Sequence, residues 1–140
     1  MHLQLITLRG VSVDKEIYEL IAPTTAGEIA VFPGHEPLVT MAAPGALAVR
    51  YNKEDDDARL QYFAISGGVI EINPNEIRVL VDDADHGEDI VEAEAKAALD
   101  RAVKLRDDAT SQVDLEKARQ IIDRQTVRLR VAELQRRRRR

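Results

Sequence analysis

The sequence predicts a β domain, a sandwich or barrel, followed by an antiparallel pair of helices. Over residues 3–82, short stretches rich in β-branched side chains alternate with Gly, Pro and Asn turns roughly every eight to twelve residues. Residues 89–106 instead contain neither Gly nor Pro and are rich in the strong helix formers Ala, Glu, Lys and Leu. The 140 residues have room for one small domain with an appendage.

The β part contains eight candidate strands. They lie at 3–10, 16–23, 27–34, 38–45, 46–51, 60–68, 69–75 and 76–83. Period-two alternation is clearest in the last two, where Ile70 and Ile72 face away from Val69, and Ile77 and Val79 alternate with polar or larger neighbours. Asn and Pro at 73–75 predict the turn between them, because Pro presets one backbone angle and Asn tolerates the left-handed region.

Two acidic runs lie outside these strands. The run at 52–57 is interpreted as the polar tip of a hairpin, because neither the glycine turn nor the distal glutamate of a calcium loop follows it. The run at 82–89 crowds acids around His86 and is the best metal candidate by composition. Its spacing fits no calcium loop, so a linker and helix cap is favoured, with Glu88 and Asp89 near the positive end of the next helix.

Two helices are predicted beyond this linker, at 89–106 and 113–134, joined by a polar break at 107–112. The apolar face of the first comprises Val91, Ala95, Ala98, Leu99, Ala102 and Leu105. That of the second comprises Leu115, Ala118, Ile122, Leu129 and Ala132, flanked by Ile121, Val127, Val131 and Leu134. These faces are narrow and rich in Ala, which leaves two interpretations: the pair simply packs on itself, or a weakly held interface lets it open.

Composition excludes several classes of protein. The absence of Cys excludes disulfides and thiolate metal sites, and no apolar run approaches a membrane span. The N-terminus lacks a secretory pattern, so a soluble protein that stays where it is made is expected. Residues 1–87 carry fourteen acidic and six basic side chains, residues 88–135 carry eleven and nine, and residues 136–140 are five arginines. An acidic first region argues against nucleic acid as its ligand.

No catalytic constellation is evident. His35 and Glu36 begin like a zinc-protease helix, but Val39 stands where the second histidine is needed and Pro37 would break the helix. Ser66 lacks the glycine two residues earlier that a nucleophile elbow requires. We therefore expect a non-catalytic protein with no metal and no cofactor.

Four motifs in register give a positive assignment. The chain reads GEIAVFPGHEPLVT at 27–40, PG at 44–45, SGGVIEINPN at 66–75 and VLVD at 79–82. These resemble the epsilon subunit of F-type ATP synthase, whose patterns are GE(L/I)G(I/V)xPGHxPL(L/V)T, PG, SGG(F/I)xEVxPN and VTVLxD. LRVAEL at 129–134 is similar to the family's terminal LRVxEL, so the resemblance covers nearly the whole chain.

The resemblance implies a flattened β-sandwich of about ten strands over 1–87, a helical hairpin over 88–135 and an additional arginine tail over 136–140. It also implies a central-stalk rotor subunit on the cytoplasmic face of the bacterial cell membrane, peripheral and without a span. This subunit couples rotation of the c-ring, through the gamma subunit, to ATP synthesis. The expected c-ring and gamma surface comprises Glu28, Phe32, Pro33, Gly34, His35, Pro37 and Leu38. The alternative is that Phe32 and Leu38 belong to the core and that the PGH segment is only a turn.

The hairpin of the resembled family inhibits ATP hydrolysis by extending toward the alpha and beta subunits. The basic residues expected to contact them here are Lys117, Arg119, Arg124, Arg128 and Arg130. The arginine tail would extend this charge, contact anionic lipid, or be a solvated end without a role.

Some members bind ATP through (I/L)DxxRA together with downstream arginines. Val91 and Glu94 replace the aspartate and arginine of that motif, while Arg124 and Arg128 match the downstream arginines. Weak or absent ATP binding is therefore expected, because an anion replaces a cation near a triphosphate. The rival hypothesis is an adaptor that binds nucleic acid or an acidic protein through the arginine tail.

Overall fold

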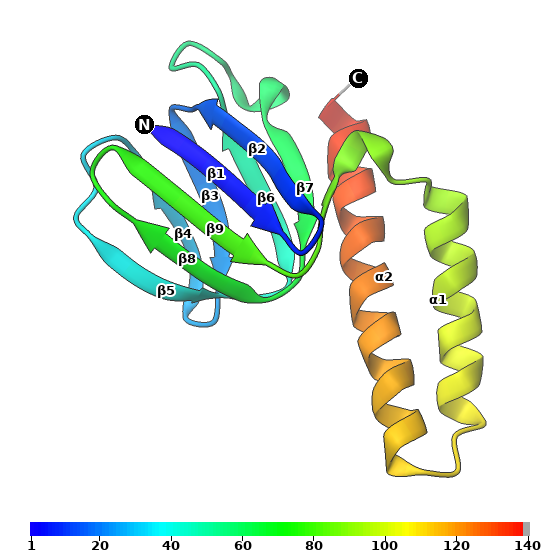
Figure 1. Ribbon diagram of the computed structural model, residues 1–140. Helices are drawn as coiled ribbons and strands as arrows, with labels where there is room; N and C mark the ends of the chain where they lie inside the picture. Colours follow the sequence, from blue (N-terminus) through cyan, green and yellow to red (C-terminus); the bar gives the residue numbers. More distant parts are fainter. Residues whose placement is uncertain (139–140) are drawn as a thin grey trace.

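The computed structural model describes residues 1–138, which form a β-sandwich with a helical hairpin along one side (Figure 1). The ten strands are β1 (His2–Thr7), β2 (Gly10–Glu16), β3 (Glu19–Thr24), β4 (Gly27–Val31), β5 (Leu38–Ala42), β6 (Gly45–Arg50), β7 (Gln61–Ile65), β8 (Gly68–Ile72), β9 (Glu76–Val81) and β10 (Ala84–His86). Short 3-10 helices, η1 (Asp57–Arg59) and η2 (Gly87–Asp89), precede β7 and follow β10. The hairpin comprises α1 (Glu92–Asp107) and α2 (Gln112–Arg138).

The strands form one sheet that folds into two layers. Its order is β10-β7-β6-β3-β5-β8-β9-β1-β2, with β4 paired to the other side of β3. The two layers meet at a corner where β3 and β5 share a single bridge, Thr24 with Ala42. All pairings are antiparallel except that of β1 with β9. The predicted sandwich followed by two helices is confirmed.

The sandwich core lies between the layers and follows the alternation in the sequence. Ile70, Ile72, Ile77 and Val79 are all buried, as the pattern predicts. Further fully buried side chains come from every layer of the fold: Leu3, Leu5, Leu20, Val31, Leu47 and Val49. At about 25 cal/mol per Å² of apolar surface, this aliphatic burial supplies most of the driving force for folding.

Two strands were missing from the sequence prediction. β2 was overlooked because its apolar alternation is limited to Val11 and Val13, of which only Val13 is buried, and its other residues are polar or Gly. β10 lies inside the run at 82–89, which was predicted to be a linker and cap. That prediction was wrong for Ala84–His86, which pair with β7. The strand was missed because its residues are mostly acidic or polar, and such side chains are common on strands at the edge of a sheet.

The helices differ from prediction at their ends and on their faces. α1 begins at Glu92 rather than at residue 89, because 87–89 form η2, and α2 extends to Arg138. Ala95, Ala102, Ala118, Val131 and Ala132 are buried as predicted. Val91 and Leu105 are exposed instead, because they lie near the two ends of α1. Gln125 and Gln135 are buried, although polar residues were not expected on that face.

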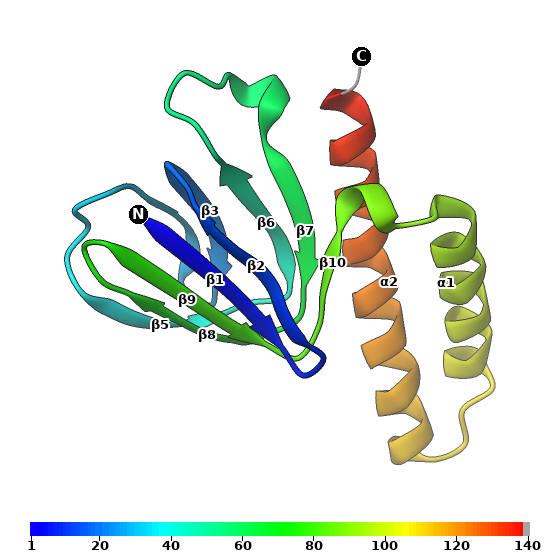
Figure 2. The same cartoon turned by 45° about the horizontal axis from the view of Figure 1, so that its top comes forward.

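The hairpin packs both on itself and on the sandwich. α2 lies between the sandwich and α1 in both ribbon views (Figure 2). It covers the outer face of β6 and β7, where small side chains let the helix approach: Ala46 and Ala48 pair across the strands with Ala64 and Tyr62. The inward neighbours Leu47 and Phe63 belong to the sandwich core. Strands that are apolar on both faces are covered on both faces.

Candidate functional site

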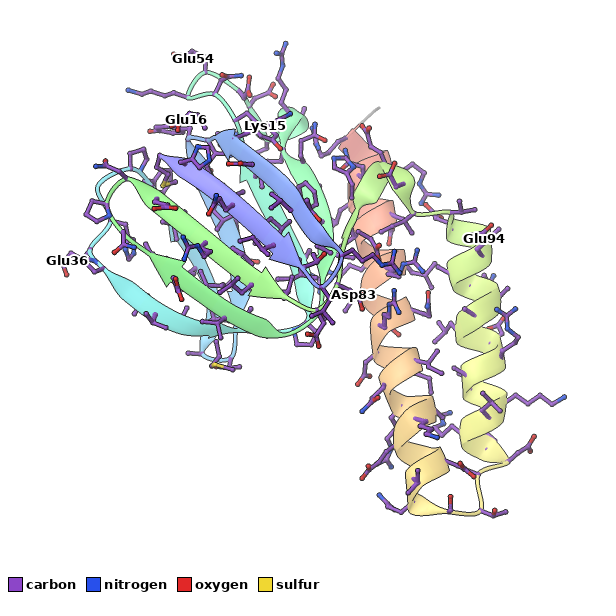
Figure 3. The ribbon with its side chains drawn as sticks, viewed as in Figure 1. Lys15, Glu16, Glu36, Glu54, Asp83 and Glu94 are labelled. Carbon is purple, nitrogen blue, oxygen red and sulfur yellow. The ribbon has the colours of Figure 1, made fainter. Side chains whose placement is uncertain are left out.

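The 32–37 loop between β4 and β5 lies at the edge of the sandwich farthest from the hairpin. Glu36, labelled in Figure 3, marks this loop on the side opposite the helices. The loop is fixed by its backbone: the Gly34 N–H donates to the Pro74 carbonyl at 2.9 Å, and the His35 N–H donates to the Phe32 carbonyl at 3.2 Å. Gly34 has a φ of +88°, which glycine adopts without strain.

The predicted surface residues of this loop are accessible. Phe32 is 42% and Leu38 is 40% exposed, so neither belongs to the core, and Pro33, Gly34 and Pro37 are also exposed. Phe32 packs edge-to-face on Tyr18, with the ring centroids 5.7 Å apart. The half-buried His35 approaches the Glu36 carbonyl with its Nδ1 at 2.6 Å, so its ring supports the turn. The loop is therefore a turn that presents two large apolar side chains.

Glu28 lies apart from the rest of this predicted surface. It is exposed near the start of β4, opposite Pro23 of β3, whereas Phe32 follows the end of the same strand. Four residues of extended chain span about 13 Å. The structure thus brings Phe32 to Leu38 together and places Glu28 at the other end of the strand.

A second accessible surface was not singled out from the sequence. Met41, Val69, Leu80 and Ile6 are paired in register across β5, β8, β9 and β1 and point away from the core; we call them the outer-sheet row. Met41 is exposed and the other three are half-buried. The signal was present in the sequence: Leu80 and Val69 are apolar at positions where the alternation calls for polar side chains.

The hairpin is attached to the sandwich by ion pairs. Arg128 Nε lies 3.3 Å from Asp85 of β10, and Arg124 Nη1 lies 3.9 Å from Asp83, just before that strand. Asp83, labelled in Figure 3, stands between the sandwich and α2. The acids that were a metal candidate by composition therefore bind arginines of the hairpin. Lys117, Arg119 and Arg130 are exposed on α2.

His86 acts as a cap at the junction of sandwich and hairpin. Its Nδ1 accepts the N–H of Glu88 at 3.0 Å, and its Nε2 lies 3.0 Å from Gln61 Oε1. Since Nδ1 must be an acceptor, Nε2 carries the proton and donates to Gln61. The ring also packs edge-to-face on Phe63 at 4.8 Å. Among residues 1–138, no group of three or more His, Asp, Glu or Cys is arranged to hold a metal ion.

A polar cleft of about 520 Å³ opens where the edge strands β2 and β10 face each other. Asp14 and Lys15 line it from β2, and His86 and Asp89 line it from the other side. The capping bonds of His86 occupy both ring nitrogens, so this histidine is not presented as a general base.

Comparison with known proteins assigns the chain. The family described as "ATP synthase, Delta/Epsilon chain, beta-sandwich domain" matches residues 1–87. The ATP synthase epsilon chain of Herpetosiphon aurantiacus is 36% identical over 138 residues, covering 99% of this chain and 98% of the relative. That of Laribacter hongkongensis is 33% identical, covering 99% and 96%. The chain belongs to the ATP synthase epsilon family.

Solved structures agree in fold. A chain of the Euglena gracilis mitochondrial ATP synthase, described as its OSCP/F1/c-ring part, superposes with a TM-score of 0.73 at 23% identity, covering 86% of this chain and 74% of that one. A chain of the central stalk and c-ring part of the Tetrahymena thermophila mitochondrial enzyme gives a TM-score of 0.57 at 14% identity. The family resemblance inferred from the sequence is confirmed.

As an epsilon chain, this protein is a non-catalytic subunit of ATP synthase and a peripheral part of that membrane complex. Within residues 1–138, no helix is both long and apolar enough to cross a membrane. The motifs quoted from the sequence correspond to β4 with the 32–37 loop and to the β8–β9 hairpin. These elements are neighbours, because β5 pairs with β8 and Gly34 bonds Pro74.

Proposed function

We propose that this epsilon chain is a rotor subunit of the central stalk, on the cytoplasmic face of a bacterial membrane, that couples c-ring rotation through gamma to ATP synthesis. The observation that carries the proposal is the match of the whole chain, hairpin included, to bacterial ATP synthase epsilon chains. A subunit that transmits torque needs a stiff body with contact surfaces, and the sandwich with its tightly bonded loop has both.

The first proposed contact surface is the 32–37 loop with Leu38, directed at the c-ring or gamma. Its large exposed side chains offer apolar area, and its fixed backbone lowers the entropy lost on docking. Glu28 contributes from the other end of β4, so it would meet a different part of the partner. The outer-sheet row offers a second apolar surface suited to gamma, because an apolar stripe that solvent can reach on the outer face of a sheet commonly marks a protein contact.

The hairpin is proposed to inhibit ATP hydrolysis by leaving the sandwich and extending toward the alpha and beta subunits. Two features support release. The apolar cluster between α2 and the sandwich is small, and on the strands it consists of Ala46, Ala64 and the half-buried Tyr62, so little apolar area is buried there. The ion pairs of Arg124 and Arg128 are partly exposed, and such pairs contribute little net stability and are weakened by salt. Release would free Arg124 and Arg128, which would join the already exposed Lys117, Arg119 and Arg130 as contacts for acidic partners.

ATP is proposed to bind the docked hairpin weakly or not at all. Glu94 points outward from α1 and is labelled in Figure 3. The small cavity of about 190 Å³ beside α1 is lined by Glu88 and Glu92, whose charges oppose a phosphate, and by Arg136, which is already paired with Glu92 at 3.3 Å. Arg124 and Arg128 already face aspartates. Isothermal calorimetry with MgATP should give no heat at micromolar concentrations, and micromolar affinity would overturn this proposal.

The decisive experiment compares ATP hydrolysis by the catalytic complex, reconstituted with the full chain, with a chain ending at Asp89, and with one ending at Gln135. Inhibition by the full chain that is relieved by truncation at Asp89, with gamma binding retained, supports the inhibitory role. Unchanged hydrolysis with gamma binding intact would remove that role and keep coupling. Failure of all three to bind gamma would refute the rotor role.

The adaptor hypothesis is tested in parallel. Salt-sensitive binding of the full chain to RNA or DNA, lost in the chain ending at Gln135, would favour it. Arg136 and Arg137 pair with Glu92 and Glu133, but these pairs are exposed and contribute little, so the binding assay decides between the two hypotheses.

A further inference from the structure

The C-terminal end of α2 contacts β7 at a point where the strand pairing of the sheet is incomplete. The pairing of β7 with β10 ends where Phe63 meets His86, because the chain then turns into η2. The next residue along β7, Tyr62, therefore has a backbone N–H beyond the end of this pairing. A buried N–H without a partner is costly, so the fold must supply an acceptor from elsewhere.

Gln135 of α2 supplies that acceptor. Its Oε1 lies 3.0 Å from the Tyr62 nitrogen, and the residue is only 3% exposed. The side chain of a helical residue 73 positions away thus continues the hydrogen bonding of β7 after β10 has ended. This explains a buried glutamine on the helix face where the sequence predicts apolar residues.

Gly87 makes room for this glutamine. A Cβ at position 87 would lie 2.9 Å from Cβ, 3.0 Å from Oε1 and 3.1 Å from Cγ of Gln135. The first residue of η2 and the side chain from α2 therefore fill the same small space, and only glycine leaves enough of it.

Arg138, one turn further along α2, binds the sandwich directly. Its Nε and Nη2 donate to the carbonyl of Ala58 at 2.8 and 2.6 Å, and its guanidinium lies 5.6 Å from the centre of the Tyr62 ring. Hydrogen bonds from a charged donor are stronger than neutral ones, and a cation over an aromatic face adds to them. Ala58 belongs to η1, in the segment that Arg50 holds by donating to the Asp55 carbonyl and to Asp57.

The neighbouring tail arginines make different contacts. Arg136 lies 3.3 Å from Glu92 at the start of α1, so it joins the two helices. Arg137 lies 2.7 Å from Glu133, one turn back on its own helix. Residues 139 and 140 lie outside the described part of the chain. Three consecutive arginines therefore have three separate roles, and Arg138 is the one bonded to η1 and stacked over Tyr62.

We propose that Gln135 and Arg138 form a latch that holds the C-terminal end of α2 on the sandwich, and that the arginine tail acts here as part of this latch. The docked hairpin occupies Arg138 with its own sandwich, so this cation reaches an acidic partner only after the latch opens. The latch itself is independent of the proposed inhibition of ATP hydrolysis; only the consequence for a partner rests on that function.

The Tyr62 amide proton reports the latch, because its hydrogen-bond acceptor belongs to α2. NMR-detected hydrogen exchange of the isolated full-length chain should show this amide protected. Arg138→Ala should raise its exchange rate about tenfold, since a charge-assisted contact is lost. Gln135→Leu should raise it at least as much, because the acceptor itself is removed. The chain ending at Gln135 should behave like Arg138→Ala.

Arg137→Ala is the matched control, since it removes the same charge from the same helix without touching the sandwich. It should leave the exchange of Tyr62 unchanged. The amides of β1, which lies between β2 and β9, monitor overall folding and should stay protected in every variant.

Two results overturn the latch: exchange of Tyr62 within twofold of the original rate in Arg138→Ala, or equal acceleration by Arg137→Ala. Since the assay uses the isolated chain, either result leaves binding to gamma untouched. Conversely, a failure to bind gamma in the reconstituted complex would leave the exchange data intact.

Discussion

Gly87→Ala should release the hairpin without unfolding the sandwich. The added methyl group would lie 2.9 Å from Cβ of Gln135, whereas carbon atoms prefer a separation of about 3.5 to 4.0 Å. The contacted atom is close to the helix backbone, so it cannot swing away as the end of a flexible side chain can. Overpacking of this kind costs about 1 to 3 kcal/mol. The hairpin can escape this cost by leaving the sandwich.

A cost of about 2 kcal/mol would shift the docking equilibrium about thirtyfold toward the released hairpin. Nitroxide labels on Arg9→Cys and Thr110→Cys measure this shift, because the chain has no cysteine of its own and both positions are exposed. Electron paramagnetic resonance should show one distance population in the parent and a second, longer one in Gly87→Ala. The circular dichroism signal of the strands should be retained.

Gly45→Ala is the control for general destabilisation. Its methyl group would crowd Pro23 of β3, at 3.1 Å from Cβ, and would not contact Gln135. It should lower the free energy of unfolding without producing the longer distance. A distance distribution in Gly87→Ala that matches the parent would refute the reasoning, since it would show that the space beside Gln135 is not limiting.

Three further changes test other parts of the molecule. Arg50→Met should lower the free energy of unfolding by about 3 to 5 kcal/mol in urea denaturation, because it strands the buried carboxylate of Glu19, which lies 2.8 Å from Arg50 Nε. Gly34→Ala should lower it by about 1 kcal/mol, because a residue with a Cβ is strained at φ +88°. Hydrogen bonds to Asp14 and Glu16 raise the pKa of His2 above 6.5. The folded state therefore holds that proton more tightly, and the stabilisation is present below the ordinary pKa and lost as pH rises through the raised one. The stability difference between the parent and His2→Gln should be larger at about pH 5.5 than at about pH 8.5.

Each of these has a result that contradicts it. For Arg50, a second change of Glu19→Gln in the Arg50→Met background should recover part of the loss, and no recovery would argue against a stranded charge. Hydrogen bonds to Asp57 and, to a smaller extent, Glu19 raise the pKa of Arg50, so Arg50 stays charged at every pH used in the denaturation assay. Gly34→Asn should be milder than Gly34→Ala, because Asn tolerates positive φ, and the reverse order would contradict a backbone origin. A stability difference for His2→Gln that is independent of pH would show that the pair with Asp14 is not a proton-linked contact.

The resemblance quoted from local motifs was reliable because those motifs are short continuous segments with their own physics. The GEIAVFPGHEPLVT stretch encodes a strand, a fixed turn and a second strand, and the structure forms β4, the 32–37 loop and β5 there. Period-two alternation identified the inward residues of β8 and β9, and the buried alanines of the hairpin followed from helical spacing. These patterns depend only on which neighbours share a face of one element.

Contacts between distant elements were beyond the sequence. The acids at 82–89 looked like a linker because their partners, Arg124 and Arg128, lie on a helix some forty residues later, and only packing brings them together. The separation of Glu28 from Phe32, by contrast, follows from the candidate strand at 27–34, since Glu28 lies near the start of β4 and Phe32 follows its end.

The sequence alone determined the β-sandwich, the helical pair and membership of the epsilon family, because strand alternation, helical period and turn chemistry are local. Only the tertiary structure decided where the hairpin rests and what holds it. The buried Gln135 accepts a hydrogen bond from the Tyr62 N–H, which lacks a strand partner only because β10 ends at His86. Arg138 donates to the Ala58 carbonyl, which is in reach only because η1 folds next to the end of α2. A buried polar side chain is required where another buried group lacks a hydrogen-bond partner, and such groups are defined only after the chain has folded.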